Sequence, residues 1–259
     1  MKYLIALLLL LAMPAFAQSG GLFSMESRED GRGWEAVGRL EIGGKAFCTG
    51  ALIAPDLVLT AAHCLFDAST GARVPVEQIQ FLAGWRNGRA AAYRRVRRAV
   101  ALEDYDFMAP ASPERVRHDV AVIELQLPIR NSAIAPFGLG PLPEAGDELG
   151  VVSYAHDRSE APSLQDYCGV LDKQDSMLVL DCSVDFGSSG SPVFSFAEGT
   201  PRIVSVISAK AQAGGEPVSL ATGLDTPLAR LRGALDEDDV FNPLSAGSRR
   251  DTGAKFIKP

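Results

Sequence analysis

Short apolar segments separated by glycine- and proline-containing turns run along most of this chain, and that pattern limits the folds open to it. Many such segments in succession are typical of a β-sandwich or β-barrel. The segments expected to form strands are 37–42, 49–53, 57–60, 78–82, 120–125, 148–154, 177–180, 192–196 and 203–208. Helical periodicity is convincing only in 227–235, where Leu228, Leu231 and Leu235 share one face. The sequence therefore predicts an all-β fold with a short C-terminal helix.

The first residues read as a targeting segment. Lys2 supplies a positive charge, 4–12 is unbroken apolar sequence, and 13–17 (Met-Pro-Ala-Phe-Ala) ends in an Ala-x-Ala cleavage pattern. These are the three parts of a secretory signal peptide. The apolar stretch is about half as long as a membrane span, which argues against an uncleaved anchor. We therefore expect cleavage after Ala17, a secreted or periplasmic protein, and no membrane anchor after cleavage.

The charge of the chain argues against nucleic acid as its main partner. The 259 residues carry a formal net charge of −7, and an acidic protein is repelled by phosphate. The run 94–98 (Arg-Arg-Val-Arg-Arg) is a local exception. Because apolar residues flank and interrupt it, we interpret it as the solvated face of a strand or loop. Nothing in the sequence indicates an oligomer, so a monomer is the default expectation.

Four cysteines in an exported chain favour two disulfides. Sequence alone allows three pairings, and we favour the local one, Cys48 with Cys64 and Cys168 with Cys182. Each bond would close a loop worth about 3 kcal/mol in the chain-entropy description. A zinc site is the competing interpretation. It is weaker, because there is no Cys-x-x-Cys pair and the histidines lack ligand spacing.

Three segments carry the residue types that nucleophilic catalysis needs. His63 follows the apolar segment 57–62, Asp119 precedes the apolar segment 120–123, and Ser189 lies in a glycine-flanked loop. A hydroxyl is a weak nucleophile at neutral pH and requires an adjacent base, a task that suits histidine. A buried carboxylate then fixes the imidazole tautomer. The glycines allow backbone N–H groups to face a developing oxyanion.

Each of these residues is ordinary when taken alone. A serine between glycines is usually a turn residue, and an aspartate before a strand is usually a turn former. Together they occur in the order His, Asp, Ser, each at the edge of an expected strand, with Cys64 directly after His63. That combination indicates a catalytic triad.

The three segments resemble those of the trypsin-like, chymotrypsin-fold serine peptidases. Residues 60–64 (Thr-Ala-Ala-His-Cys) match the histidine motif of that family. Residues 118–122 (His-Asp-Val-Ala-Val) resemble its aspartate motif, and 187–192 (Gly-Ser-Ser-Gly-Ser-Pro) resemble the serine motif of many bacterial members. The resemblance covers about 36–235, and the histidine motif is its most specific part.

The resemblance implies two perpendicular six-stranded β-barrels with the triad in the cleft between them. It implies a serine endopeptidase in which Ser189 attacks the scissile carbonyl and His63 moves the proton. The backbone N–H groups of Gly187 and Ser189 would form the oxyanion hole, and Cys48 with Cys64 matches the family disulfide beside the histidine. The partner would be a protein or peptide substrate, and the mechanism requires no metal and no organic cofactor.

The expected domain organisation follows from these assignments. The signal peptide is 1–17, and 18–35 is an N-terminal segment or a short propeptide. The trypsin-like peptidase domain is 36–235, with a crossover between its two barrels near 128–146, where proline, alanine and glycine are frequent. Residues 236–259 begin with an acidic run and are expected to form a flexible C-terminal tail.

Two departures from the family pattern affect activation and specificity. Residue 188 is serine, whereas digestive zymogens have an aspartate there that pairs with the freed N-terminal amine, so we expect no such switch. Ser183 occupies the position where a carboxylate selects Arg or Lys. Phe186 is expected at the rim of the specificity pocket, and 208–210 at the strand that binds substrate. Within that strand Ser208 and Lys210 are candidate contacts, and Lys210 either favours acidic side chains or points to solvent.

Alternatives remain for the residues and for the function. His118 could be confused with the base, Asp104 and Asp106 are other acids, and His156 is interpreted as a surface loop residue. An α/β-hydrolase requires Gly-x-Ser-x-Gly and the order Ser, acid, His, neither of which is present. The remaining competitor is a catalytically silent binding protein on a peptidase fold, since fold alone does not fix function.

Overall fold

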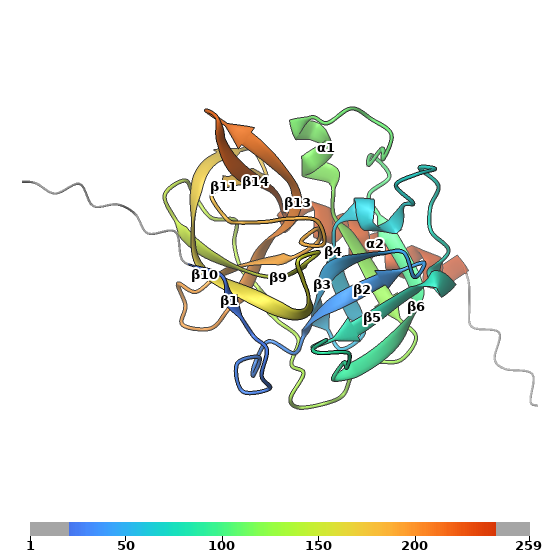
Figure 1. Cartoon of the computed structure of the whole chain (residues 1–259). Helices are drawn as coiled ribbons and strands as arrows, with labels where there is room; N and C mark the ends of the chain where they lie inside the picture. Colours follow the sequence, from blue (N-terminus) through green and yellow to red (C-terminus); the bar gives the residue numbers. More distant parts are fainter. Residues whose placement is uncertain (1–20, 242–259) are drawn as a thin grey trace, which may run out of the picture.

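Two six-stranded β-barrels packed side by side form the body of the molecule (Figure 1). The computed structural model describes residues 21–241. The first barrel is closed in the order β2-β3-β4-β7-β6-β5, and all its neighbouring strands are antiparallel. Its strands are β2 (Val37–Ile42), β3 (Ala46–Ala54), β4 (Leu57–Thr60), β5 (Ile79–Ala83), β6 (Ala92–Ala101) and β7 (Ala121–Leu125).

The second barrel closes because β9 pairs with both β10 and β12. The order around it is β9-β10-β11-β14-β13-β12. Its strands are β9 (Glu148–Ala155), β10 (Arg158–Gln174), β11 (Met177–Leu180), β12 (Pro192–Ser195), β13 (Arg202–Ala213) and β14 (Glu216–Gly223). Two short strands extend it, β1 (Phe23–Ser24) on β10 and β8 (Gly138–Leu139) on β13. The predicted all-β fold of two six-stranded barrels is confirmed.

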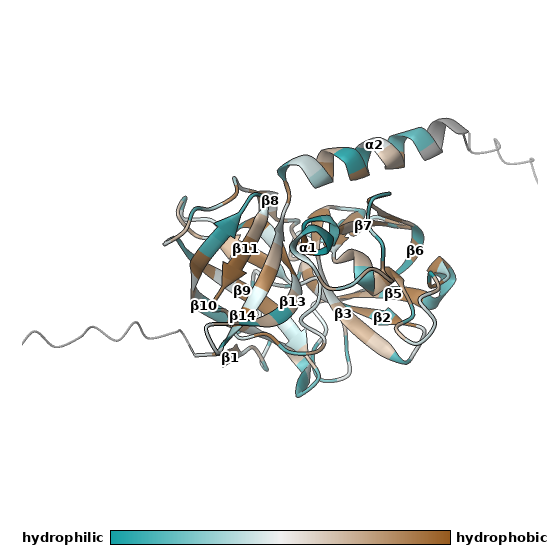
Figure 2. Cartoon of the chain, turned by 90° about the horizontal axis from the view of Figure 1, so that it is seen from above, coloured by the Kyte–Doolittle hydropathy of each residue, from teal (hydrophilic) through white to brown (hydrophobic). Residues whose placement is uncertain are grey.

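The C-terminal helix α2 (Asp225–Phe241) covers one side of the first barrel (Figure 2). Leu228, Leu231 and Leu235 are buried in the core of that barrel, as the helical periodicity predicted. Arg98 of β6 donates to the Leu235 carbonyl at 2.8 Å. The helix continues to Phe241, so 236–241 is helical where a tail was expected, and 242–259 lie outside the described residues.

A second helix, α1 (Pro113–His118), lies between β6 and β7 of the first barrel, directly before Asp119, and packs against the second barrel. The Ser112 hydroxyl accepts from the Arg115 N–H at 3.2 Å and caps the helix. Val116 is buried against apolar side chains of the second barrel, and its carbonyl accepts from the Thr222 hydroxyl of β14. The helix was not predicted, because six residues are too few for apolar periodicity.

The arginine-rich run 94–98 lies on β6, and most of its charge is used within the first barrel. Arg97 and Arg98 both bind the carboxylate of Glu124 on β7, at 2.8 and 2.6 Å. Arg94 donates to the carbonyls of Leu127 and Pro128. These contacts agree with the interpretation of the run as a strand face.

Residues 21–35 are part of the folded body. Phe23 and Ser24 pair with β10, and Met25 is fully buried. The Met25 carbonyl accepts from Arg86 Nε at 2.6 Å, which ties this segment to the first barrel. These contacts join 21–35 to both barrels, and whether this segment is removed from the mature protein stays a prediction. The expected signal peptide, 1–17, lies outside the described residues, and no helix within 21–241 is long and apolar enough to cross a membrane.

Candidate active site

Strand pairing brings His63 and Asp119 together. His63 lies in the 3₁₀ turn η1 (Ala62–Leu65) directly after β4, and Asp119 lies between α1 and β7. Because Thr60 of β4 pairs with Ala121 of β7, the segments beyond these strand ends are neighbours. Asp119 is buried, with 4% of its surface exposed. A carboxylate removed from water in this way requires hydrogen-bond donors.

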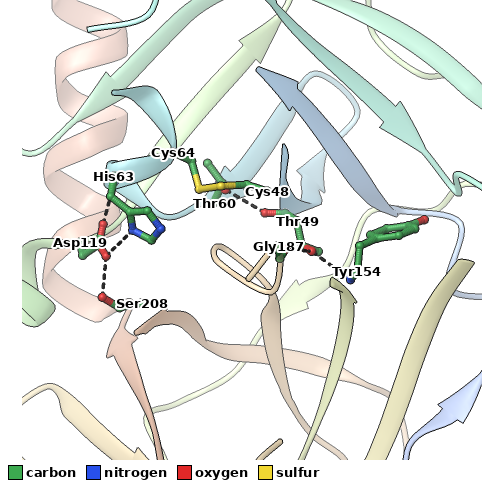
Figure 3. Close-up of a disulfide and its surroundings, with 9 residues drawn as sticks. All are labelled: Cys48, Thr49, Thr60, His63, Cys64, Asp119, Tyr154, Gly187 and Ser208. Atoms are coloured by element: carbon green, nitrogen blue, oxygen red, sulfur yellow. Dashed lines mark hydrogen bonds and ion pairs between the residues drawn. A yellow bond between two sulfur atoms is a disulfide. The ribbon is translucent and has the colours of Figure 1, made fainter. Parts of the chain in front are cut away.

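Asp119 receives those donors from three groups (Figure 3). Its Oδ1 accepts from the His63 backbone N–H at 2.8 Å, and its Oδ2 lies 2.7 Å from His63 Nδ1. The Ser208 hydroxyl donates to Oδ2 at 2.5 Å. A carboxylate on Nδ1 favours the tautomer with its proton on Nδ1, which leaves Nε2 as the acceptor nitrogen.

Ser208 therefore has a contact that the sequence did not reveal. It was expected to bind substrate from the edge strand, whereas its side chain is buried against Asp119. The alternative acids lie elsewhere: Asp104 Oδ2 is 2.9 Å from Arg230 Nη1, and Asp106 accepts from the Met108 N–H. Among the three candidate acids, Asp119 is the one that contacts His63.

The loop around Ser189 presents two backbone N–H groups without protein partners. The Phe186 carbonyl accepts from the His156 N–H at 2.7 Å, and the Ser188 carbonyl accepts from the Ser191 N–H at 3.0 Å. In a trans peptide the C=O and the following N–H point in opposite directions. Within residues 21–241 the N–H groups of Gly187 and Ser189 donate to no protein acceptor. This is the arrangement that an oxyanion hole requires.

One cleft of about 980 Å³ between the barrels contains these groups. His63 and Asp119 line it from the first barrel, and Gly187, Ser189 and Ser208 from the second. Phe186 also lines it and is 73% exposed, which agrees with a place at the rim. The other two candidate substrate contacts, Ser183 and Lys210, line a second cavity of about 630 Å³. The two cavities are adjacent along the chain. Asp185 lines the second cavity and Phe186 lines the first, and likewise Ala209 lines the first and Lys210 the second.

Both disulfides have the favoured pairing. Cys48 joins Cys64 with an S–S distance of 2.02 Å, and Cys168 joins Cys182 with 1.99 Å. The sulfurs of Cys48 and Cys64 lie within 4.8 Å of a His63 ring nitrogen, as ligands of a metal would. They are bonded to each other, however, and zinc takes cysteine as the thiolate. The zinc interpretation therefore fails at this cluster.

Comparison with known proteins places this arrangement in a family. The family model described as a trypsin-like peptidase domain matches residues 48–201, which include His63, Asp119 and Ser189. The chain belongs to this family. The matched residues include strands of both barrels and residues that line the cleft between them.

The relatives of this trypsin-like peptidase domain are serine proteases. A glutamyl endopeptidase of Bacillus licheniformis is 27% identical over 149 residues, which are 57% of this chain and 45% of the relative. A modular serine protease of Drosophila melanogaster is 35% identical over 78 residues, 30% of this chain and 10% of the relative. The chain spans less than half the length of these curated relatives. A solved structure of a Glu endopeptidase in complex with MPD has the same fold, with a TM-score of 0.66 at 17% identity over 79% of this chain and 92% of that one.

In this trypsin-like peptidase domain the residue before the candidate nucleophile is held by backbone groups of its own loop and of β9. Ser188 is fully buried. Its hydroxyl donates to the Tyr154 carbonyl at 3.2 Å and accepts from the Asp185 N–H at 3.3 Å. The side chain that replaces the aspartate of the zymogens thus has its hydrogen bonds without a charged partner.

The Lys210 side chain is held by two neighbours, so it is neither directed only at solvent nor free to extend over the specificity pocket. Its Nζ lies 2.7 Å from Asp185 Oδ1 and 4.5 Å from the centroid of the Phe186 ring. Hydrogen bonding from Lys210, with a further bond from the Phe186 N–H, lowers the pKa of the Asp185 carboxyl below its ordinary value. The ion pair joins the two segments that line the second cavity.

Proposed function

We propose that the protein is an exported serine endopeptidase with a His63–Asp119–Ser189 triad. The observation that carries the proposal is the pair of hydrogen bonds that fixes His63 on the buried Asp119, in the cleft that Ser189 lines. The unpaired N–H groups of Gly187 and Ser189 support it, because they supply a site for a developing oxyanion. The two disulfides and the expected signal peptide support export.

The reaction proceeds through an acyl-enzyme. The Ser189 Oγ attacks the scissile carbonyl carbon, while His63 Nε2 takes the hydroxyl proton and Asp119 stabilises the imidazolium. The carbonyl oxygen becomes an oxyanion that accepts from Gly187 and Ser189. The C–N bond then breaks, and His63 returns the proton to the leaving amine. Water, deprotonated by His63, attacks the ester and releases the acid, and Ser189 regains its proton.

A fluorophosphonate probe tests this proposal, because it labels an activated serine. We expect labelling of the full chain expressed with its own leader, and loss of labelling in Ser189→Ala. Ser191→Ala is the matched control, since the Ser191 hydroxyl is fully buried and has no hydrogen-bond partner within 21–241. This control is expected to label like the wild type. A folded wild-type protein that does not label would instead support a catalytically silent binding protein.

Lys210, in the pocket beside the cleft, motivates an expected preference for acidic side chains at the residue before the scissile bond, in a pocket that Asp181 and Asp185 also line. Lys210 is held by Asp185, so a substrate carboxylate would compete with Asp185 for the same ammonium group. Ser183 contributes no charge to this cavity. The glutamyl endopeptidase among the relatives leads to the same expectation.

Removal of Asp185 is therefore expected to strengthen the preference. In Asp185→Asn, the ratio of kcat/KM for a glutamyl peptide to kcat/KM for the matching glutaminyl peptide should rise. The rise should be at most about fivefold, because an exposed ion pair contributes little more than that factor. In Lys210→Gln the preference should fall, and salt should weaken it in the wild type. Fluorogenic peptides that differ only as Glu and Gln measure the ratio. An equal ratio in the wild type and Lys210→Gln would exclude Lys210 as the determinant.

A further inference from the structure

A threonine of the first barrel holds the loop that carries the candidate nucleophile. Thr49 follows Cys48 on β3 and is fully buried. Its N–H donates to the Ser189 carbonyl at 2.9 Å, and its hydroxyl donates to the Gly187 carbonyl at 2.9 Å. Its carbonyl accepts from the Thr60 hydroxyl at 2.9 Å (Figure 3). Every polar atom of Thr49 is thus engaged, and two of them reach the second barrel.

The direction of the hydroxyl hydrogen follows from its second partner. Thr49 Oγ1 lies 3.1 Å from the backbone N–H of Tyr154, which can only donate. Because a hydroxyl has a single hydrogen, the oxygen accepts from Tyr154 and its hydrogen is directed at the Gly187 carbonyl. The Thr49 side chain therefore links β9 to the 187–189 loop.

This contact fixes the peptide that follows Gly187, one of the two peptide planes that flank this residue. Gly187 has a φ of 96°, a backbone conformation that a residue with a Cβ rarely adopts. The peptide plane before it is held by His156, whose N–H donates to the Phe186 carbonyl, and the plane after it is held by Thr49. The Gly187 N–H lies in the first plane, with the Phe186 carbonyl. Because a glycine can rotate about φ and ψ at little cost, the hydrogen bond from Thr49 to the second plane restrains that rotation and keeps the first plane, with its N–H, in register with the rest of the loop.

We infer that Thr49 is a positioning residue for the oxyanion hole, and that its hydroxyl holds the 187–189 loop in the competent conformation. This inference rests on the proposed endopeptidase activity. It also explains how the loop is held with Ser188 next to the nucleophile, since a neutral hydrogen-bonded clamp takes the place of an ion pair. Thr49 acts through Gly187 and touches no substrate.

The test compares two substitutions of Thr49. Thr49→Val keeps the shape and removes the hydroxyl, whereas Thr49→Ser keeps the hydroxyl. We expect kcat to fall by about 10- to 100-fold in Thr49→Val with KM within about twofold, because the loss of one oxyanion donor costs about 100-fold or more. Thr49→Ser should retain kcat. A peptide trifluoromethyl ketone, which forms an oxyanion on binding, should lose affinity for Thr49→Val by the same factor as kcat.

Thr60→Val is the matched control. It also deletes a buried hydroxyl that hydrogen-bonds across β3 and β4, but Thr60 makes no hydrogen bond to the 187–189 loop. It should lower Tm without lowering kcat. Equal losses of kcat in both valine variants, or an unchanged kcat in Thr49→Val, would overturn the inference.

Two further measurements separate this inference from other failures. If Thr49→Val does not fold, the comparison of Thr49→Ala with Thr49→Ser carries the same expectation, and equal kcat values in that pair would overturn it. Fluorophosphonate labelling of the wild type is determined first. An unreactive wild type would refute the proposed function, whereas a reactive wild type with unchanged labelling rate in Thr49→Val would refute only the role of Thr49.

Discussion

Replacement of Ser189 by alanine is expected to lower kcat for peptide hydrolysis by about a million-fold, the scale on which such a nucleophile contributes. The change deletes one oxygen in a cleft open to water, so Tm should stay within about 2 °C of the wild type. Peptide hydrolysis by purified protein, with burst titration of active sites, measures the loss. A variant that retained more than about 1% of kcat would show that another group is the nucleophile.

The same experiment extends to His63, because the triad acts as a unit. His63→Ala alone is expected to cost about as much as Ser189→Ala, and the double variant little more than either, since each loss leaves the other group without a role. Losses that multiplied in the double variant would mean that Ser189 and His63 act independently. That result would contradict the proton transfer between them.

The local sequence pattern correctly predicted those strands that alternate regularly and are bounded by turn residues. Strands β2, β4 and β11 begin and end where the alternation and the flanking turns placed them. The 17 residues of β10 gave no such signal, because its register with β9 shifts twice and the strand pairs with three neighbours, β1, β9 and β11. A strand interrupted in this way loses the period of two by which strands are read from sequence.

The residues of the candidate site likewise fall into those that the sequence predicted and those that it did not. His63, Asp119 and Ser189 were predicted because each sits in a short motif of its own. The roles of Ser208 and Thr49 were not, since Ser208 reaches Asp119 across 89 residues and Thr49 reaches Gly187 across 138. A hydrogen bond between segments so far apart leaves no spacing in the sequence, and only the packing of one barrel on the other creates it.

The two barrels approach each other closely at Gly190, and Gly190→Ala is expected to destabilise the protein by about 2–5 kcal/mol. The estimate combines about 1–2 kcal/mol for a side chain at positive φ with about 1–3 kcal/mol for overpacking. Gly190 has a φ of 77°, and a Cβ there would lie 2.1 Å from Thr60 Oγ1 and 2.4 Å from the Thr49 carbonyl oxygen. At about 2–4 °C per kcal/mol, Tm should fall by roughly 4–20 °C.

Gly44→Ala separates the two causes. Gly44 also has a positive φ, 66°, but a Cβ there would meet nothing within 4 Å, so this variant should lose only the backbone strain, about 1–2 kcal/mol. The difference between the two variants then measures the contact between the barrels. Equal losses would mean that the barrels move apart at little cost, and that the nucleophile loop is not rigidly held.

A second substitution shows which neighbour of Gly190 resists the added methyl group. Thr60→Ala removes the hydroxyl at 2.1 Å but leaves the Thr49 carbonyl oxygen at 2.4 Å. That oxygen belongs to a backbone fixed by strand pairing on both sides of β3. Thr60→Ala should therefore not rescue Gly190→Ala. If Tm recovers in the double variant, the clash involves the Thr60 side chain alone. The Ser189 loop would then pack against a surface that can rearrange, and not against the fixed backbone of the first barrel.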